Sequence, residues 1–133
     1  MAEPDLAAIQ RLLSEFAWAA DRGLADAMAA LFLADGVLTI NGQVLAGPAS
    51  IAADCRKRFE IPERKTRHTW SNLRVDQQDG DTCTSTAVQL TFETTAAGQP
   101  AKLRVSDVTD TFRKSPQGHW RFASRTIVRQ MAL

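Results

Sequence analysis

The amino-acid sequence predicts an α+β fold in which helices pack on one face of a curved, mixed but mostly antiparallel sheet. Two observations predict it. Apolar residues recur at helical spacing near the start of the chain, and four long segments rich in β-branched residues follow, separated by short turn sequences. Helices and strands that are segregated in this way are typical of α+β proteins. The 133 residues, of which 44% are hydrophobic, fit a single domain over residues 1–133.

The first expected helix covers residues 4–22. Its apolar side chains form one stripe, Pro4 suits the first turn, and Gly23 stands where a left-handed residue often ends a helix. A shorter, alanine-rich helix is expected over residues 24–32, and a third over residues 49–59 after a Gly-Pro pair. The first two helices would form a helical hairpin.

A β-hairpin is the first expected sheet structure. Asn41 and Gly42 separate two short β-prone runs, and Asn-Gly is the strongest short-range hairpin signal. The longer strands are expected over residues 66–76, 82–94, 103–113 and 120–128. A curved sheet with helices across its concave side encloses a cone, and its open mouth would be a pocket for a small molecule.

Composition and charge argue against several classes of partner. The 16 Lys and Arg residues are balanced by 15 Asp and Glu, so no overall field favours nucleic acid or an acidic membrane. Cys55 and Cys83 lack the spacing of a zinc site or a disulfide framework. No secretory leader or membrane-spanning run is visible, and we expect a cytoplasmic protein. No nucleotide, flavin or metal motif is present, so we expect no cofactor and no metal.

Five groups of residues carry a family resemblance through their order and spacing. They are residues 19–23, 29–37, 47–51, 66–68 with Asn72, and 110–113 with 120–122. With them, nearly the whole chain resembles a SnoaL-like domain of the nuclear transport factor 2-like superfamily. The resemblance implies a cone-shaped, cystatin-like α+β barrel. Relatives include scytalone dehydratase, polyketide cyclases, steroid isomerases, epoxide hydrolases, small subunits of ring-hydroxylating dioxygenases and proteins that only bind partners, so fold does not decide function.

Asp21 and His68 are the leading candidates for acid–base chemistry. Asp21 lies at the edge of the apolar stripe in the last helical turn, where burial and the helix dipole are expected to raise its pKa. The resemblance implies that an aspartate at this position orients a catalytic histidine in scytalone dehydratase-like proteins, and His68 resembles that histidine. The alternatives are a capping or ion-pairing role for Asp21 and a structural role for His68.

The chain departs from the dehydratase pattern at several positions. It has two histidines and no tyrosine, and His119 follows a glycine in a turn. Val88 stands where the dehydratase has its second histidine, and Asn41 falls near one of its water-activating tyrosines. The remaining Asp–His pair would suit a simple proton shift, a ring closure or an assisted hydrolysis.

Asp110 is a third candidate, on a late strand beside apolar residues of the same face. Polyketide cyclases of this superfamily resemble this layout, with an acidic residue as general acid–base. The favoured alternative is a cross-strand pair with Arg121, Arg125 or Arg104. Arg121, Arg125 and Arg129 are expected on one face of the last strand, as a solvated or interface surface rather than a nucleic-acid site.

The expected ligand is a small apolar or aromatic, oxygenated ring compound. Residues expected to contact it are Phe16, Phe32, Asn41, Trp70, Asn72, Val88 and Phe112. Three hypotheses remain open: a cofactor-free isomerase, cyclase or lyase; a non-catalytic module for ligand binding or oligomerisation; and a small scaffolding subunit of a ring-hydroxylating oxygenase. In the superfamily that the chain resembles, a second copy usually covers the exposed sheet face, so the resemblance implies a homodimer, with a trimer as the alternative.

Overall fold

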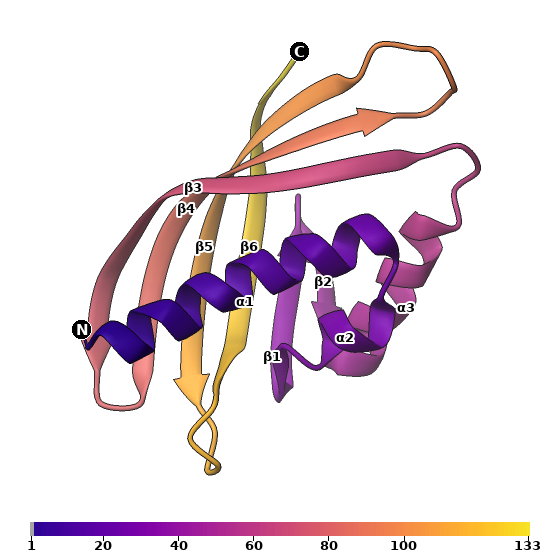
Figure 1. The fold of residues 1–133 in the computed structure, drawn as a ribbon. Helices are drawn as coiled ribbons and strands as arrows, with labels where there is room; N and C mark the ends of the chain where they lie inside the picture. The colour runs from indigo at the N-terminus through magenta and orange to yellow at the C-terminus, as the bar shows by residue number, and fades with distance from the viewer. Residues whose placement is uncertain (1) are drawn as a thin grey trace.

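The computed structural model describes residues 2–133, without the side chains of Glu3 and Pro4. This part of the chain forms three helices and six strands (Figure 1). In chain order they are α1 (Glu3–Arg22), α2 (Ala25–Ala29), β1 (Phe32–Ile40), β2 (Gln43–Ala46), α3 (Pro48–Phe59), β3 (Lys65–Asp79), β4 (Thr82–Thr94), β5 (Lys102–Lys114) and β6 (Trp120–Ala132).

The strands form one sheet in the order β2-β1-β6-β5-β4-β3. Neighbouring strands are antiparallel except β1 and β6, which are parallel. Figure 1 shows α1 running across the concave face of the curved sheet, with α2 and α3 near the β1 and β2 end. This arrangement confirms the predicted fold class. None of the described helices combines the length and the apolar character needed to cross a membrane.

Helix α1 is held on the sheet by its apolar stripe. Ile9 and Phe16 are buried, and the Phe16 ring meets the rings of Phe32 and Phe122 edge-on at centroid distances of 6.4 and 6.2 Å. Burying each side chain of this size contributes about 1.5–3 kcal/mol to stability. The helix ends where the sequence predicts, at Gly23, whose φ of 66° is left-handed.

The second helix is shorter than expected. It ends at Ala29, and Phe32, expected inside it, begins β1 instead. The backbone N–H of Phe122 donates to the carbonyl of Leu31 at 2.8 Å, and Phe32 pairs with Phe122 in parallel register. Pairing with a strand that is distant in the sequence therefore outweighs the local helical propensity.

An irregularity in the pairing of β5 with β6 changes the face on which one arginine lies. The register shifts by one residue between Thr111 and Phe112. Because side chains alternate along a strand, this shift puts Arg121 on the outer face, opposite Arg125 and Arg129. The expectation that all three arginines share one face is therefore wrong.

Asp110 and Arg125 form a fully buried pair on the inner face of the sheet. Their side chains are 0% and 1% exposed, and Arg125 Nη1 lies 3.6 Å from Asp110 Oδ2. The guanidinium also stacks over the rings of Phe16 and Phe122, at 4.4 and 5.0 Å. Burial raises the pKa of Asp110 to about 6, although the charge of Arg125 opposes the rise. Of the alternatives weighed for Asp110, the structure has the cross-strand pair with Arg125.

Replacing Arg125 by Met should lower the free energy of unfolding by about 3–5 kcal/mol at neutral pH, because the Asp110 carboxylate is left buried without a partner. The folded-state pKa of Asp110, already above its ordinary 3.8, would rise further. The folded state would then hold this proton more tightly than the unfolded state, so the loss should shrink as the pH falls from about 8 to about 5. Urea denaturation followed by tryptophan fluorescence measures it.

The double variant Arg125→Met/Asp110→Leu is the control for this prediction. It removes both charges and should recover most of the stability lost in the single variant. If the single and double variants lost the same free energy of unfolding at every pH, the unpartnered Asp110 carboxylate would not be the cause of the loss.

Candidate functional site

A partly enclosed cavity of about 100 Å³ lies between the helices and the inner face of the sheet. Its apolar wall consists of Phe16, Ala20, Met28, Leu38, Ile40, Cys55 and Ile127. Its polar wall consists of Asn41, Asp54, Arg58, Arg64, His68, Gln89, Thr91, Arg104, Ser106 and Arg129. A cavity that combines an apolar surface with convergent polar groups is the usual form of a small-molecule site, and this one has an unusually large polar share.

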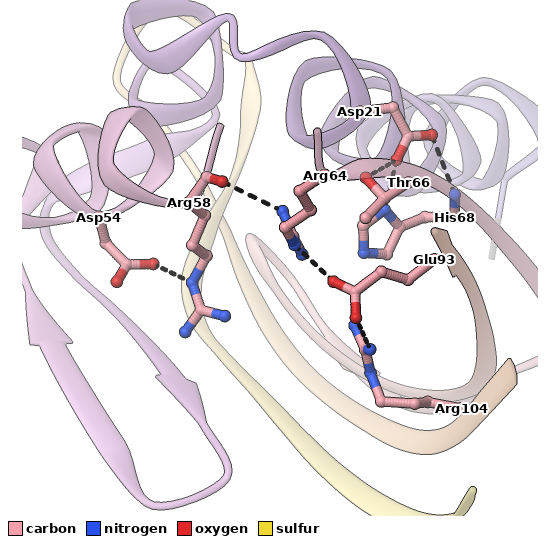
Figure 2. A network of polar contacts seen from close by, with 8 residues as sticks. All are labelled: Asp21, Asp54, Arg58, Arg64, Thr66, His68, Glu93 and Arg104. Atoms are coloured by element: carbon pink, nitrogen blue, oxygen red, sulfur yellow. Dashed lines mark hydrogen bonds and ion pairs between the residues drawn. The ribbon is translucent and has the colours of Figure 1, made fainter. Parts of the chain in front are cut away.

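Asp21 and His68 meet at the edge of this cavity (Figure 2). Asp21 lies in the last turn of α1, and His68 lies near the start of β3. Oδ1 of Asp21 is 2.5 Å from Nδ1 of His68 and accepts a hydrogen bond from the Thr66 hydroxyl at 3.0 Å. Oδ2 accepts the backbone N–H of His68 at 2.9 Å. Both oxygens of Asp21 are therefore held by β3.

The strand pattern explains why β3 can hold Asp21 in this way. Side chains two residues apart share a face of a strand, so Thr66 and His68 both point toward α1. The Asp21 side chain is 4% exposed and the His68 side chain 13%. The pair is therefore shielded from bulk water, while His68 still lines the cavity.

The hydrogen bonds to Asp21 reverse the expected direction of its pKa. Burial raises the pKa of Asp21, but hydrogen bonds from the side chain and backbone of His68 and from Thr66 outweigh burial, and the net pKa is below the ordinary value. The expectation of a raised pKa is wrong because it counted burial and the helix dipole but not these three donors.

The tautomer of His68 follows from its ionised neighbour. A carboxylate accepts hydrogen bonds and cannot donate them, so Nδ1 of His68 carries the proton that faces Asp21. Nε2, on the other side of the ring, keeps its lone pair. This is the arrangement of an imidazole that can accept a proton from a bound molecule.

A second polar network joins α3 to β4 and β5. Glu93 accepts a hydrogen bond from Nε of Arg64 at 2.5 Å and another from Nη1 of Arg104 at 2.8 Å. Nε of Arg58 donates to Asp54 at 2.6 Å, and Nη1 of Arg64 donates to the Arg58 carbonyl at 3.4 Å (Figure 2). Burial raises the pKa of Glu93, but the hydrogen bonds from the two arginines lower it by more, and the net pKa lies below its ordinary value.

The arginines of the cavity wall could not all be predicted from the sequence. Arg58 and Arg64 stand among other charged residues, and nothing local separates them from a solvated surface. Arg104 was considered only as a partner for Asp110. The alternation of side chains along a strand could have indicated Arg104, because it shares its face of β5 with Ser106 and Asp110.

Two of the residues expected to contact a ligand line the cavity, Phe16 and Asn41. Asn41 lies in the β1–β2 turn with a φ of 48°, and its Oδ1 accepts the backbone N–H of Arg129 at 2.7 Å. Its amide is thereby fixed beside the end of β6. Cys55, whose pKa is raised by burial, also lines the cavity.

The expectation that Phe32, Phe112 and Trp70 line the pocket is corrected by the structure. The rings of Phe32 and Phe112 stack on Phe122 at 5.0 and 5.1 Å and fill the space between α1 and the sheet. Trp70 donates its indole N–H to the Ser14 hydroxyl at 3.0 Å, and it is not part of the cavity wall. These aromatic side chains face inward as expected, but they pack against other residues of the protein and do not line the cavity.

Asn72 and Val88 do not reach the cavity either. Asn72 is exposed, with a φ of 55° at an irregularity in the pairing of β3 with β4. Val88 lies on the outer face of β4, because the buried residues beside it, Ala87 and Gln89, point inward. The expectation for Val88 is corrected because the more polar face of β4 is the inner one.

Asp110 lies apart from the cavity wall, in the buried pair with Arg125. His119 lies in the turn before β6, and its backbone N–H is bonded to the Ser115 hydroxyl at 3.2 Å. Among the side chains that the structure describes, no cluster of three or more His, Cys, Asp or Glu residues has the arrangement of a metal site.

Solved structures with the same fold include proteins to which different functions, or none, are assigned by name. A hexachlorocyclohexane dehydrochlorinase, LinA type 2, superposes with a TM-score of 0.87 at 21% identity, over 98% of this chain and 88% of that one. A ketosteroid isomerase-like protein from Erwinia carotovora atroseptica superposes with a TM-score of 0.82 at 21% identity, over 98% and 99%. A protein of unknown function with a cystatin-like fold from Nostoc punctiforme gives 0.84 at 21% identity, over 98% and 94%.

These identities are low, so the superpositions establish the shared fold. A comparison with curated proteins finds no match. The family model of the SnoaL-like domain matches residues 3–126, which is most of the sequence. This chain belongs to the SnoaL-like domain family.

Proposed function

We propose that this protein catalyses cofactor-independent proton transfer on a small, oxygenated ring compound, as an isomerase, cyclase or lyase. The observation that carries the proposal is the 2.5 Å contact between Asp21 Oδ1 and His68 Nδ1, with His68 in the cavity wall. Two solved structures of the same fold carry the names hexachlorocyclohexane dehydrochlorinase and ketosteroid isomerase-like protein, and both names refer to ring compounds.

His68 is the proposed general base. Its Nε2 removes a proton from a carbon next to a carbonyl group of the substrate, and the electron pair moves onto the carbonyl oxygen. Asp21 is the proposed positioning residue: it holds the ring and stabilises the imidazolium that forms. In an isomerisation the imidazolium then returns the proton to another carbon of the enolate. In an elimination the enolate electron pair forms a new C=C bond as the bond from the neighbouring carbon to the leaving oxygen breaks, and the imidazolium gives its proton to that oxygen.

Donors for the developing negative charge are available in the same wall. Gln89 and Ser106 are paired across β4 and β5, and both line the cavity. An amide N–H and a hydroxyl at this position would stabilise an enolate oxygen most strongly when its charge is greatest. A base together with neutral donors for the developing oxyanion is the minimum that enolisation needs.

A non-catalytic ligand-binding protein is the second candidate. The observation that favours it is the absence of any tyrosine and of a second histidine near the cavity, which leaves His68 as its single imidazole among the described residues. The two candidates differ in whether the bound molecule exchanges protons.

The variant His68→Gln tests the proposed general base. The wild-type protein in D₂O should speed the exchange of α-protons in one or more members of a panel of cyclic ketones, measured by ¹H NMR. His68→Gln should lower this rate by about 10²–10⁴-fold, because the general base is lost. His119→Gln is the matched control and should leave the rate unchanged. Absence of exchange above buffer, or equal rates in His68→Gln and wild type, would contradict the proposal and favour the non-catalytic candidate.

The second prediction concerns Asp21→Asn and the tautomer of His68. An asparagine amide can donate to Nδ1, so the proton should move toward Nε2 and the exchange rate should fall by about 10⁴-fold or somewhat less. ¹⁵N NMR of the imidazole distinguishes the two tautomers directly. An unchanged tautomer together with an unchanged rate would show that Asp21 does not position His68.

The third prediction follows from the lowered pKa of Asp21. Its folded-state value lies below the ordinary 3.8, so the unfolded state binds this proton more tightly and stability is lost as the pH falls through this range. Asp21→Asn should therefore be less stable than wild type at neutral pH, and the difference should shrink in acid. Urea denaturation at a series of pH values measures it, and a difference independent of pH would oppose this explanation.

A further inference from the structure

We infer that the molecule bound by this pocket carries an anionic oxygen group, a carboxylate in the simplest case, and that Arg129 with Arg104 binds it. The inference rests on the proposed function and names the substrate class of the same site. It adds a negative charge to the ligand expected from the sequence, a small apolar or aromatic, oxygenated ring compound.

The cavity wall contains more positive than negative charge. Four arginines line it: Arg58, Arg64, Arg104 and Arg129. Two carboxylates pair with three of them, since Asp54 contacts Arg58 and Glu93 contacts both Arg64 and Arg104. Two positive charges therefore remain without a carboxylate among the described residues.

Asp21 does not neutralise this excess by direct contact. Its two oxygens are taken by Thr66 and by the side chain and backbone of His68. When His68 is neutral, the whole wall still has a net positive charge, and when His68 is protonated the excess is larger by one. The charge is local, because the complete chain carries a net charge of only +1.

Arg129 is the best placed of the four to bind an anion. Among the side chains that the structure describes, which exclude Glu3, no carboxylate lies within ion-pair distance of its guanidinium, whereas the other three arginines are held by Asp54 and Glu93. Its backbone is fixed by the bond to Asn41, and it pairs with Ser106 across β5 and β6. Arg129 is an exposed residue of the cavity wall, and none of its described contacts neutralises its charge.

Arg104 provides a second cationic group on the same side. It lies two residues from Ser106 on the inner face of β5, with a side chain that is 20% exposed. Glu93 is shared between Arg104 and Arg64, so it cannot neutralise both. A planar carboxylate matches the forked donors of arginine, and a partly enclosed site strengthens this attraction relative to open water.

The remaining walls define the rest of the ligand. Phe16, Leu38, Ile40 and Ile127 provide an apolar surface for a ring, and His68 lies at the wall that also holds Gln89. A cavity of about 100 Å³ limits the ring to a small one. The site therefore fits a compact carbocyclic acid better than a large neutral polycycle.

The test compares two probes of nearly the same shape, benzoate and benzamide, by isothermal titration calorimetry and by NMR shifts of the Ile127 and Leu38 methyl groups. Wild-type protein should bind benzoate about tenfold more tightly than benzamide, and this preference should fall at high salt. Arg129→Gln should abolish the preference by weakening benzoate binding about tenfold, with benzamide unaffected. Arg129→Lys, which keeps the charge, should retain part of it.

Arg121→Gln is the matched control, because Arg121 lies on the outer face of the same strand. It should leave both affinities unchanged. Equal binding of the two probes to wild type, an unchanged preference in Arg129→Gln, or shifts confined to residues away from the cavity would each overturn the inference.

The experiment separates this inference from the proposed function, because it measures binding without turnover. If His68→Gln abolishes proton exchange but benzoate has no advantage over benzamide, the proposed function stands and the anionic substrate class is wrong. If Arg129 confers the preference but no ketone exchanges its protons, the pocket is a non-catalytic anion-binding site and the proposed function is wrong.

Discussion

Packing of α1 across the concave face of the sheet is the constraint on which the rest of this protein depends. The apolar stripe of the helix, with Ile9 and Phe16, covers the inner side chains of the strands. The same packing brings the last helical turn against the start of β3, where Asp21 reaches Thr66 and His68. Without the burial of the stripe there would be no cavity and no contact between the two candidate groups.

The inner face of the sheet is unusually polar for a surface that a helix covers. Buried polar groups reduce stability unless they are paired, and two ion-pair clusters oppose this cost here, although the 3.6 Å contact of Asp110 with Arg125 is not a hydrogen bond. Asp110 and Arg125 form one buried pair beneath Phe16, and Glu93 joins Arg64 to Arg104 at the cavity. The first pair lies apart from the cavity wall, whereas the second forms part of it. The Asp110–Arg125 pair therefore acts on stability alone, whereas the arginines bound to Glu93 also shape the cavity wall.

The candidate site combines a held carboxylate with an arginine that is free to bind. Three donors fix Asp21 as an anion, which directs the Nδ1 proton of His68 and leaves Nε2 as the basic atom. On the other side, Arg129 has no carboxylate partner among the described residues, and it offers its donors to a bound molecule. A proton acceptor and an anion-binding group in one small cavity favour a substrate whose orientation is set by charge.

Most of the fold could be predicted from local patterns, whereas the site could be predicted only in part. The helix ending at Gly23, the Asn-Gly hairpin and the strand over Thr82–Thr94 follow from the sequence, because caps, turns and alternation act over a few residues. Asp21 and His68 were identified by resemblance. The predicted direction of the Asp21 pKa shift was wrong, because the three hydrogen-bond donors that lower this pKa come from β3, which is distant in the sequence.

The order of helices and strands, the stripe that packs α1 and the short list of groups able to move protons can all be read from local sequence patterns. Three features require the folded chain: the inward face of β4, the start of a strand at Phe32, and the separation of Arg121 from Arg125 and Arg129. It also decided that Arg58, Arg64 and Arg104 gather around one cavity. The physical reason is that strand pairing and register shifts join distant segments, and a single extra residue in a strand moves every later side chain to the other face.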